Sequence, residues 1–86
     1  MDNPIKKRID ELGISTHAAA RILSSPGDEI TQASVHHHYA GNRRISADSM
    51  EKYSGRMQIS MRDMRDWNRF LKEQKIKENS HDNNNY

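Results

Sequence analysis

The segment ITQASVHHHYAGNRR, residues 30–44, concentrates the side chains of this chain that could do chemistry. It carries one glutamine, three consecutive histidines and two adjacent arginines, and it contains no aspartate or glutamate. Amide and guanidinium groups form hydrogen bonds with nucleobase edges and phosphates, whereas imidazoles bind metals or transfer protons. These residue types favour either a surface that contacts a polyanion or a metal or acid–base site.

The spacing of the histidines argues against a metal site. Adjacent residues of a helix point about 100° apart, and none of the three has the i, i+4 spacing that lets two histidines converge on one ion. The chain also has no glycine-rich phosphate loop, nucleophile elbow or carboxylate pair in an apolar setting. We therefore expect no metal, no cofactor and no enzymatic activity.

Helical geometry divides residues 31–40 into two faces. With Val35 set toward the core and steps of about 100° per residue, Tyr39 returns to within about 40° of the same direction. His38 lies about 60° away and should cover the edge of the core. The remaining positions give a short, polar outer face that suits the DNA major groove, where glutamine can read adenine and small residues can meet a thymine methyl. The residues predicted to read bases are Gln32, Ala33, Ser34, His36 and His37.

The loop after this helix offers groups for the nucleic-acid backbone. Asn42, Arg43 and Arg44 follow Gly41 directly. Their amide and guanidinium donors can bind phosphates and fix the register of the helix without reading sequence. We assign these three residues to phosphate contact.

Five helix starts must position these residues. Asn3-Pro4 combines an N-cap residue with proline at the first helical position. The other four starts place isoleucine before a hydroxyl N-cap and another apolar residue five positions after the isoleucine, which is the spacing of a hydrophobic staple. They are Ile14-Ser15, Ile30-Thr31, Ile45-Ser46 and Ile59-Ser60.

The expected helix ends agree with these starts. Gly13, Gly41 and Gly55 are candidates for left-handed C-caps, and Pro26-Gly27 interrupts the chain after Leu23. The pattern predicts helices at about 15–23 and 31–40 and an all-α fold, a compact bundle of about five short helices.

Composition limits the alternatives. The 86 residues are 33% hydrophobic and 30% charged, which favours one domain with a small core, predicted at 1–72, and a polar, disordered tail at 73–86. The formal charge of +2 permits a polyanion partner. Cysteine is absent, and no apolar run approaches the roughly 20 residues of a membrane span. We expect a soluble, cytoplasmic protein with no membrane partner.

Four segments in this order resemble the lambda-repressor-like helix-turn-helix family, which includes phage Cro proteins and bacterial XRE regulators. They are NPIKKRIDELGIST, AAARIL, ITQASVHHHYAGNRRIS and SGRMQISMRDMRDW. Residues 54–67 are similar to the end of YdaS-type, Cro-like prophage regulators, and the resemblance covers residues 3–67. It implies a sequence-specific transcriptional regulator, a prophage repressor that occupies a double-stranded DNA operator with helix 31–40 in the major groove.

The resemblance also adds phosphate contacts and one departure. Thr16 occupies the position where the family has a phosphate-contacting glutamine, and we place Thr31, the N-cap of the second motif helix, in the same class. The family has a single glycine between the motif helices, whereas this chain has SSPGDE between Leu23 and Ile30. The pair of motif helices should tolerate the longer turn, because closing a flexible loop costs only roughly 0.6 kcal/mol more per doubling of its length. Asp28 and Glu29 in it should point away from DNA.

The methionines and Trp67 leave two interpretations open. Core packing is favoured, because methionine fills irregular gaps. Regulators of this fold commonly bind two half-sites as dimers, so a homodimer, at least on DNA, is also expected, with Met61, Met64 and Trp67 as its candidate contact.

An alternative function is that of an antitoxin, or of a regulator associated with a toxin–antitoxin pair, which acts partly by protein–protein binding. The polar C-terminal segment would fold on its partner, while the DNA-binding half regulates its own promoter. Some YdaS-type relatives are described as antitoxin-like, which makes this alternative concrete.

Overall fold

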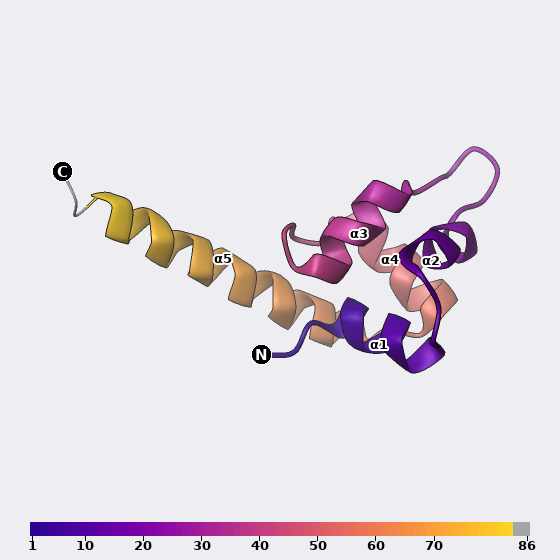
Figure 1. Ribbon diagram of the computed structural model, residues 1–86, viewed down its shortest axis with the longest axis horizontal. Helices are drawn as coiled ribbons and strands as arrows, with labels where there is room; N and C mark the ends of the chain where they lie inside the picture. Colours follow the sequence, from indigo (N-terminus) through magenta and orange to yellow (C-terminus); the bar gives the residue numbers. More distant parts are fainter. Residues whose placement is uncertain (84–86) are drawn as a thin grey trace.

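The computed structural model describes residues 1–83 and contains five helices and no strand in that range (Figure 1). This confirms the predicted all-α fold. The helices are α1 (Pro4–Leu12), α2 (Thr16–Leu23), α3 (Gln32–Ala40), α4 (Ala47–Met57) and α5 (Met61–Asn83).

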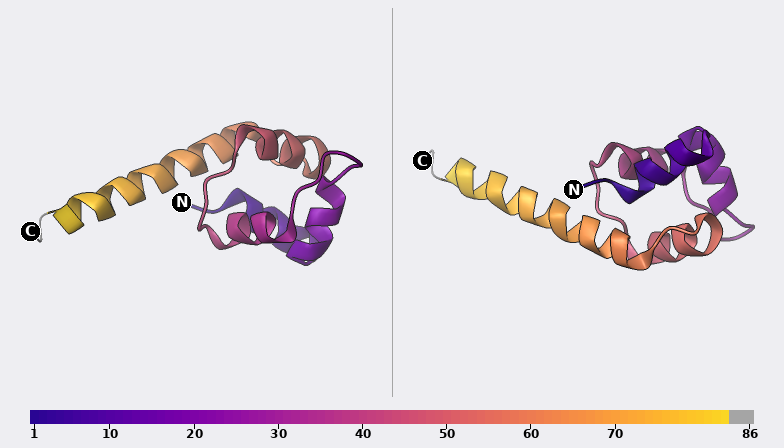
Figure 2. Two further views of the ribbon diagram at one scale, coloured as in Figure 1. Left: turned by 90° about the horizontal axis from the view of Figure 1, so that it is seen from above. Right: turned by 90° about the horizontal axis from the view of Figure 1, so that it is seen from below.

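Helix α3, the predicted recognition segment, packs on α1 and α2, and α4 packs on α2. Helix α5 starts against α1 and α4 and then extends away from the other helices, so the molecule measures 48 × 23 × 22 Å. In both views of Figure 2, α4 and the first part of α5 lie along one side of the body and α3 along the other. The outer face of α3 is therefore not covered by α5.

The helix starts follow the predicted caps. The Asn3 side-chain oxygen accepts hydrogen bonds from the backbone N–H groups of Ile5 and Lys6, at 2.9 and 3.2 Å. The hydroxyl groups of the other four caps each accept a hydrogen bond from the backbone N–H three residues later. These caps are Ser15, Thr31, Ser46 and Ser60. Each cap satisfies a donor that the helix itself leaves unpaired.

Two of the three predicted glycine stops are confirmed. Gly13 and Gly41 adopt the left-handed conformation, with φ of 65° and 78°. The prediction for Gly55 is wrong, because α4 continues through it to Met57 and ends at Gln58, which takes the left-handed conformation with φ of 56°. Met57 is only 1% exposed, so the additional turn of helix carries an apolar side chain into the core.

The backbone of the polar C-terminal segment also differs from expectation. Residues 73–83 continue α5 as a helix, where we expected a disordered tail from residue 73. Lysine, glutamate and glutamine are good helix formers, and no glycine or proline follows Ser60. The helix therefore need not end where its packing ends. The rest of the expected tail, residues 84–86, lies outside the described residues.

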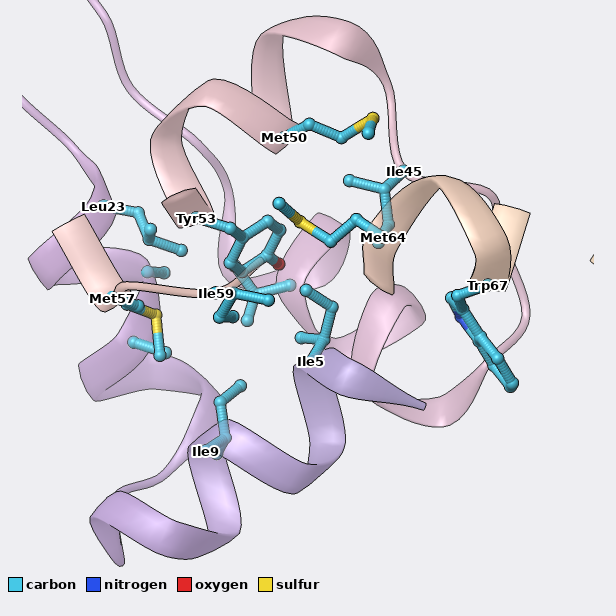
Figure 3. Close-up of a cluster of buried hydrophobic side chains, with 13 residues drawn as sticks. Ile5, Ile9, Leu23, Ile45, Met50, Tyr53, Met57, Ile59, Met64 and Trp67 are labelled. Atoms are coloured by element: carbon cyan, nitrogen blue, oxygen red, sulfur yellow. The ribbon is translucent and has the colours of Figure 1, made fainter. Parts of the chain in front are cut away.

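The core takes buried side chains from all five helices (Figure 3). Met64 is fully buried, Trp67 is 7% exposed, and the Trp67 ring stacks on Phe70 with centroids 5.3 Å apart. Core packing is thus the correct interpretation for these two residues. A dimer contact through Met64 and Trp67 is wrong for the folded chain, because these side chains already pack inside one molecule. Met61 is half-buried.

The insertion between α2 and α3 forms a closed turn at one end of the molecule (Figure 1). The backbones of Ser25 and Asp28 exchange two hydrogen bonds of 3.1 and 2.9 Å, and Gly27 has φ of 79°. The Ser24 hydroxyl donates to the Ala20 carbonyl and accepts from the Ile30 backbone N–H. The inserted residues thus form a loop whose two ends, Ser24 and Ile30, are hydrogen-bonded to each other, and α2 and α3 remain packed.

The two acids of this turn lie differently. The Asp28 carboxylate accepts a hydrogen bond of 2.7 Å from the ammonium group of Lys52, which α4 contributes. Lys52 also binds Asp48, and its hydrogen bonds to the two carboxylates raise its pKa. Glu29 instead borders a groove beside Gln32 at the start of α3. Asp28 is therefore turned toward α4, whereas Glu29 stays near the predicted interface.

Candidate nucleic-acid interface

The inner face of α3 is anchored by two buried residues. Val35 is fully buried, as predicted, and His38 is 2% exposed. Tyr39 is half-buried, and its hydroxyl donates a hydrogen bond of 2.7 Å to Asp10 at the end of α1. The helix therefore presents a fixed side to the solvent.

The position of His38 corrects the prediction of a ring at the edge of the core. Its Nδ1 lies 2.8 Å from the Tyr53 hydroxyl of α4, and the two rings meet edge to face, with centroids 5.5 Å apart. Burial lowers the pKa of His38 to about 4, with smaller contributions from the nearby Arg43 and His37. Burial also raises the pKa of Tyr53 above its usual value. The imidazole can be buried because it is neutral and has a hydrogen-bond partner.

The five residues predicted to read bases all lie on α3 outside its buried face. Gln32, Ala33 and His36 are exposed, while Ser34 and His37 are half-buried. We call these five residues the outer face of α3. The side chains there are short or carry hydrogen-bonding groups, and none is acidic.

The three consecutive histidines diverge, as their spacing predicts. His36 and His37 have ring centroids 6.2 Å apart, and His38 points into the core. Within the described part of the chain, no three histidine, aspartate or glutamate residues lie close enough together to hold a metal ion.

The residues predicted to bind phosphates lie at both ends of α3. Asn42, Arg43 and Arg44 are exposed in the loop after Gly41. The Arg43 guanidinium donates a long hydrogen bond of 3.4 Å to the Ser34 hydroxyl, so it folds back over the outer face.

The two predicted threonines lie at helix N-termini. Thr31 is exposed, and its hydroxyl accepts a hydrogen bond from the backbone N–H of Ser34 while donating to the Ser34 hydroxyl. Thr16 is half-buried at the start of α2. Both are therefore next to backbone N–H groups that could also face an anion.

Two hydrogen-bonded contacts of this region could not be predicted from the sequence. His17 Nδ1 lies 3.1 Å from Gln32 Oε1, which joins the first turn of α2 to the first residue of α3. Asn3 caps α1 with its oxygen, and its Nδ2 donates to the carbonyls of His38 and Tyr39 at 2.8 and 3.1 Å. Each contact links residues distant in the chain, so local spacing gives no indication of it.

A shallow, open groove of about 520 Å³ runs beside the His17–Gln32 contact, between α2 and the inserted turn. Its lining mixes apolar and charged residues: His17, Ala20, Arg21, Ser24, Ser25, Pro26, Glu29, Ile30 and Gln32. The groove extends the surface of the outer face of α3 toward α2.

Comparison of the chain with protein-family models, with curated proteins and with solved structures finds no match in any of the three. A function must therefore be argued from the surface itself. None of the helices in residues 1–83 is both long enough and apolar enough to cross a membrane. Residues 31–44 combine hydrogen-bonding side chains with two arginines and carry no carboxylate of their own, and the acid Glu29 borders them beside Gln32. The segment itself therefore has the charge needed to approach an anion.

Proposed function

We propose that this protein is a sequence-specific, double-stranded DNA-binding transcriptional regulator of the lambda-repressor-like, Cro-like kind. In this proposal α2 and α3 act as a helix-turn-helix, and α3 enters the major groove. The main support is the division of α3 into a buried inner face and an outer face that is exposed or half-buried, whose side chains are short or carry hydrogen-bonding groups and are not acidic. A helix with such a face can approach base edges closely.

The roles follow from the positions along α3. Gln32 and Ala33 lie in the first turn, which is the part of a recognition helix that reads base edges. His37 lies one turn further along the outer face, between the flanking residues Ser34 and His36. We assign Asn42 and Arg44 to the phosphates beyond the helix, and Thr16 and Thr31 to those at its other end.

Arg43 differs from the other predicted phosphate contacts of the loop after α3 because its side chain reaches the outer face of α3. Its guanidinium already reaches the Ser34 hydroxyl in the free protein. In the proposal the exposed Arg43 side chain exchanges the Ser34 hydroxyl for a phosphate, which leaves the outer face free to contact bases. We therefore assign Arg43 to phosphate contact, where it strengthens binding without selecting sequence.

In the proposed mechanism the protein represses transcription by occupying its operator and excluding polymerase. This part of the proposal rests on analogy with the lambda-repressor-like family. A homodimer on two half-sites is part of the proposal. Its contact surface lies away from Met64 and Trp67, because both are buried. A palindromic binding site and a dimer in sedimentation of the DNA complex are the expected results.

The test begins with selection of bound duplexes from a random pool, followed by titration of the selected site at several salt concentrations. Binding through several phosphate contacts should lose affinity steeply as salt rises. Gln32→Ala should reduce discrimination at one base position by about 1–3 kcal/mol. Gln74→Ala, which removes an exposed glutamine from α5, is the matched control and should change nothing.

Failure of the selection to enrich any sequence would contradict the proposal. Equal weakening of all sequences by Gln32→Ala would remove Gln32 from base reading while leaving DNA binding intact. Tight binding to a protein partner, with no DNA preference, would favour the antitoxin-like alternative, for which the helix α5 that projects from the body offers a surface (Figure 2).

A further inference from the structure

The contact between His17 and Gln32 unites a proton-binding group with an amide on the outer face of α3. His17 Nδ1 and Gln32 Oε1 are 3.1 Å apart, and both side chains are exposed. Gln32 is the first residue of α3, so its amide lies where the helix would approach a base. A group that orients this amide also determines what the amide can recognise.

The chemistry of the two groups makes the orientation depend on protonation. A glutamine amide has an accepting oxygen on one side and two N–H donors on the other. A protonated imidazole can only donate, so the amide must turn its oxygen toward His17 and its N–H groups outward. A neutral imidazole can accept at Nδ1, which allows the amide to flip and present its oxygen outward.

We infer that His17 is a positioning residue that selects which edge of the Gln32 amide faces the DNA. The inference rests on the proposed function and deepens it by naming a determinant of base specificity. With His17 protonated, outward N–H groups favour the acceptors on guanine, O6 and N7. With His17 neutral and its proton on Nε2, the amide can turn its oxygen outward, which favours the amino groups of adenine or cytosine.

The surroundings of His17 contain charges of both signs. Arg21, one turn further along α2, and Glu29, in the inserted turn, line the same groove as His17. His36, a second exposed imidazole, lies one turn beyond Gln32 on α3. The experiments must therefore separate His17 from His36, which substitution of His17 itself does.

The first experiment uses the free protein. The side-chain amide resonances of Gln32 are followed by ¹⁵N–¹H NMR from pH 5 to pH 8 in the wild type and in His17→Ala. The expected result is a titration of the Gln32 amide in the wild type that disappears in the variant. A Gln32 amide that does not titrate, or that titrates equally in His17→Ala, would overturn the inference whatever the protein binds.

The second experiment uses the selected duplex with each of the four bases at the position that Gln32→Ala identifies. The preference for guanine over adenine should rise by about tenfold between pH 8 and pH 5.5, the value of one well-formed hydrogen bond. His17→Ala should lose both the pH dependence and part of the discrimination. His17→Asn retains an amide near the position of Nδ1 and should recover the discrimination without the pH dependence.

The outcomes separate the inference from the function on which it rests. A wild-type protein that selects a sequence, but whose base preference is the same at both pH values and in His17→Ala, contradicts the role of His17 alone. A protein that selects no sequence contradicts both the proposed function and this role. Recovery of the discrimination by His17→Asn would show that a hydrogen bond at this position orients Gln32. The pH dependence of the wild type, absent from the variant, would show that the imidazole controls that orientation.

Discussion

His38 and Tyr53 join α3 to α4 through a buried hydrogen bond, with Nδ1 and the hydroxyl oxygen 2.8 Å apart. The two side chains are 2% and 0% exposed. A polar contact in this position has direction, unlike the apolar contacts around it, so it restricts the rotation of α3 about its own axis. The residues of the outer face of α3 depend on that rotation for their exposure.

The first prediction concerns the loss of stability at acidic pH. Because burial holds the pKa of His38 at about 4, below the usual 6.5, the unfolded chain binds a proton between these values that the folded chain does not bind. The contribution to stability is complete above about pH 6.5 and is lost as pH falls toward 4. We expect this imidazole to lower the free energy of unfolding by about 2 kcal/mol between pH 7 and pH 4.5.

Urea unfolding at several pH values measures this effect, and His38→Asn is the control because it cannot titrate. The variant should be less stable at pH 7 but should lose less stability on acidification. If the wild type and His38→Asn show the same dependence on pH, the buried neutral imidazole is not its cause.

A second prediction concerns Asn3, whose side chain serves two helices. Asn3→Ala removes the N-cap of α1 and both hydrogen bonds to the carbonyls at the end of α3, and should destabilise the fold by about 2 kcal/mol. Asn3→Asp keeps the capping oxygen but cannot donate to the carbonyls. Thermal unfolding should rank the wild type first, Asn3→Asp second and Asn3→Ala last. Equal stability of Asn3→Asp and the wild type would show that the contacts with α3 contribute nothing.

A third prediction uses two glycines with opposite roles. Gly55 lies inside α4, and a Cβ there would meet no atom within 4 Å beyond its chain neighbours and the nearby backbone of α4, so Gly55→Ala should stabilise the protein by about 0.5–1 kcal/mol. Gly41 has φ of 78° and faces the Trp67 ring, so Gly41→Ala should destabilise it by at least about 1 kcal/mol. Denaturant midpoints measure both. A loss of stability in Gly55→Ala would contradict its place within the helix.

A fourth prediction tests the loop after α3. Arg43→Ala and Arg44→Ala should each weaken binding to all duplexes by a similar factor and reduce the slope of log affinity against log salt by about one. Arg56→Ala is the matched control, because Arg56 is exposed at the end of α4. Its salt slope should equal that of the wild type. An unchanged slope for both loop variants would remove them from the phosphate contacts.

The starts of the helices and the exposed side of α3 could be predicted from the sequence. A cap acts within four residues, so Ser15, Thr31, Ser46 and Ser60 could be identified from their neighbours alone. The outer face of α3 followed from one buried residue, Val35, and the fixed rotation of a helix. Both inferences use only local geometry.

Features that depend on a partner distant in the chain could not be predicted in this way, because they arise from the packing of the helices. The residues around Gly55 do not show that α4 continues past it. The helix continues because its next residues carry Met57 into the core. The hydrogen bonds of His38 with Tyr53 and of His17 with Gln32 each span 15 positions between different helices. Side chains this far apart meet only when packing sets the distance and angle between their helices. The orientation of α3 and of the Gln32 side-chain amide therefore depends on the packing of α3 against α2 and α4.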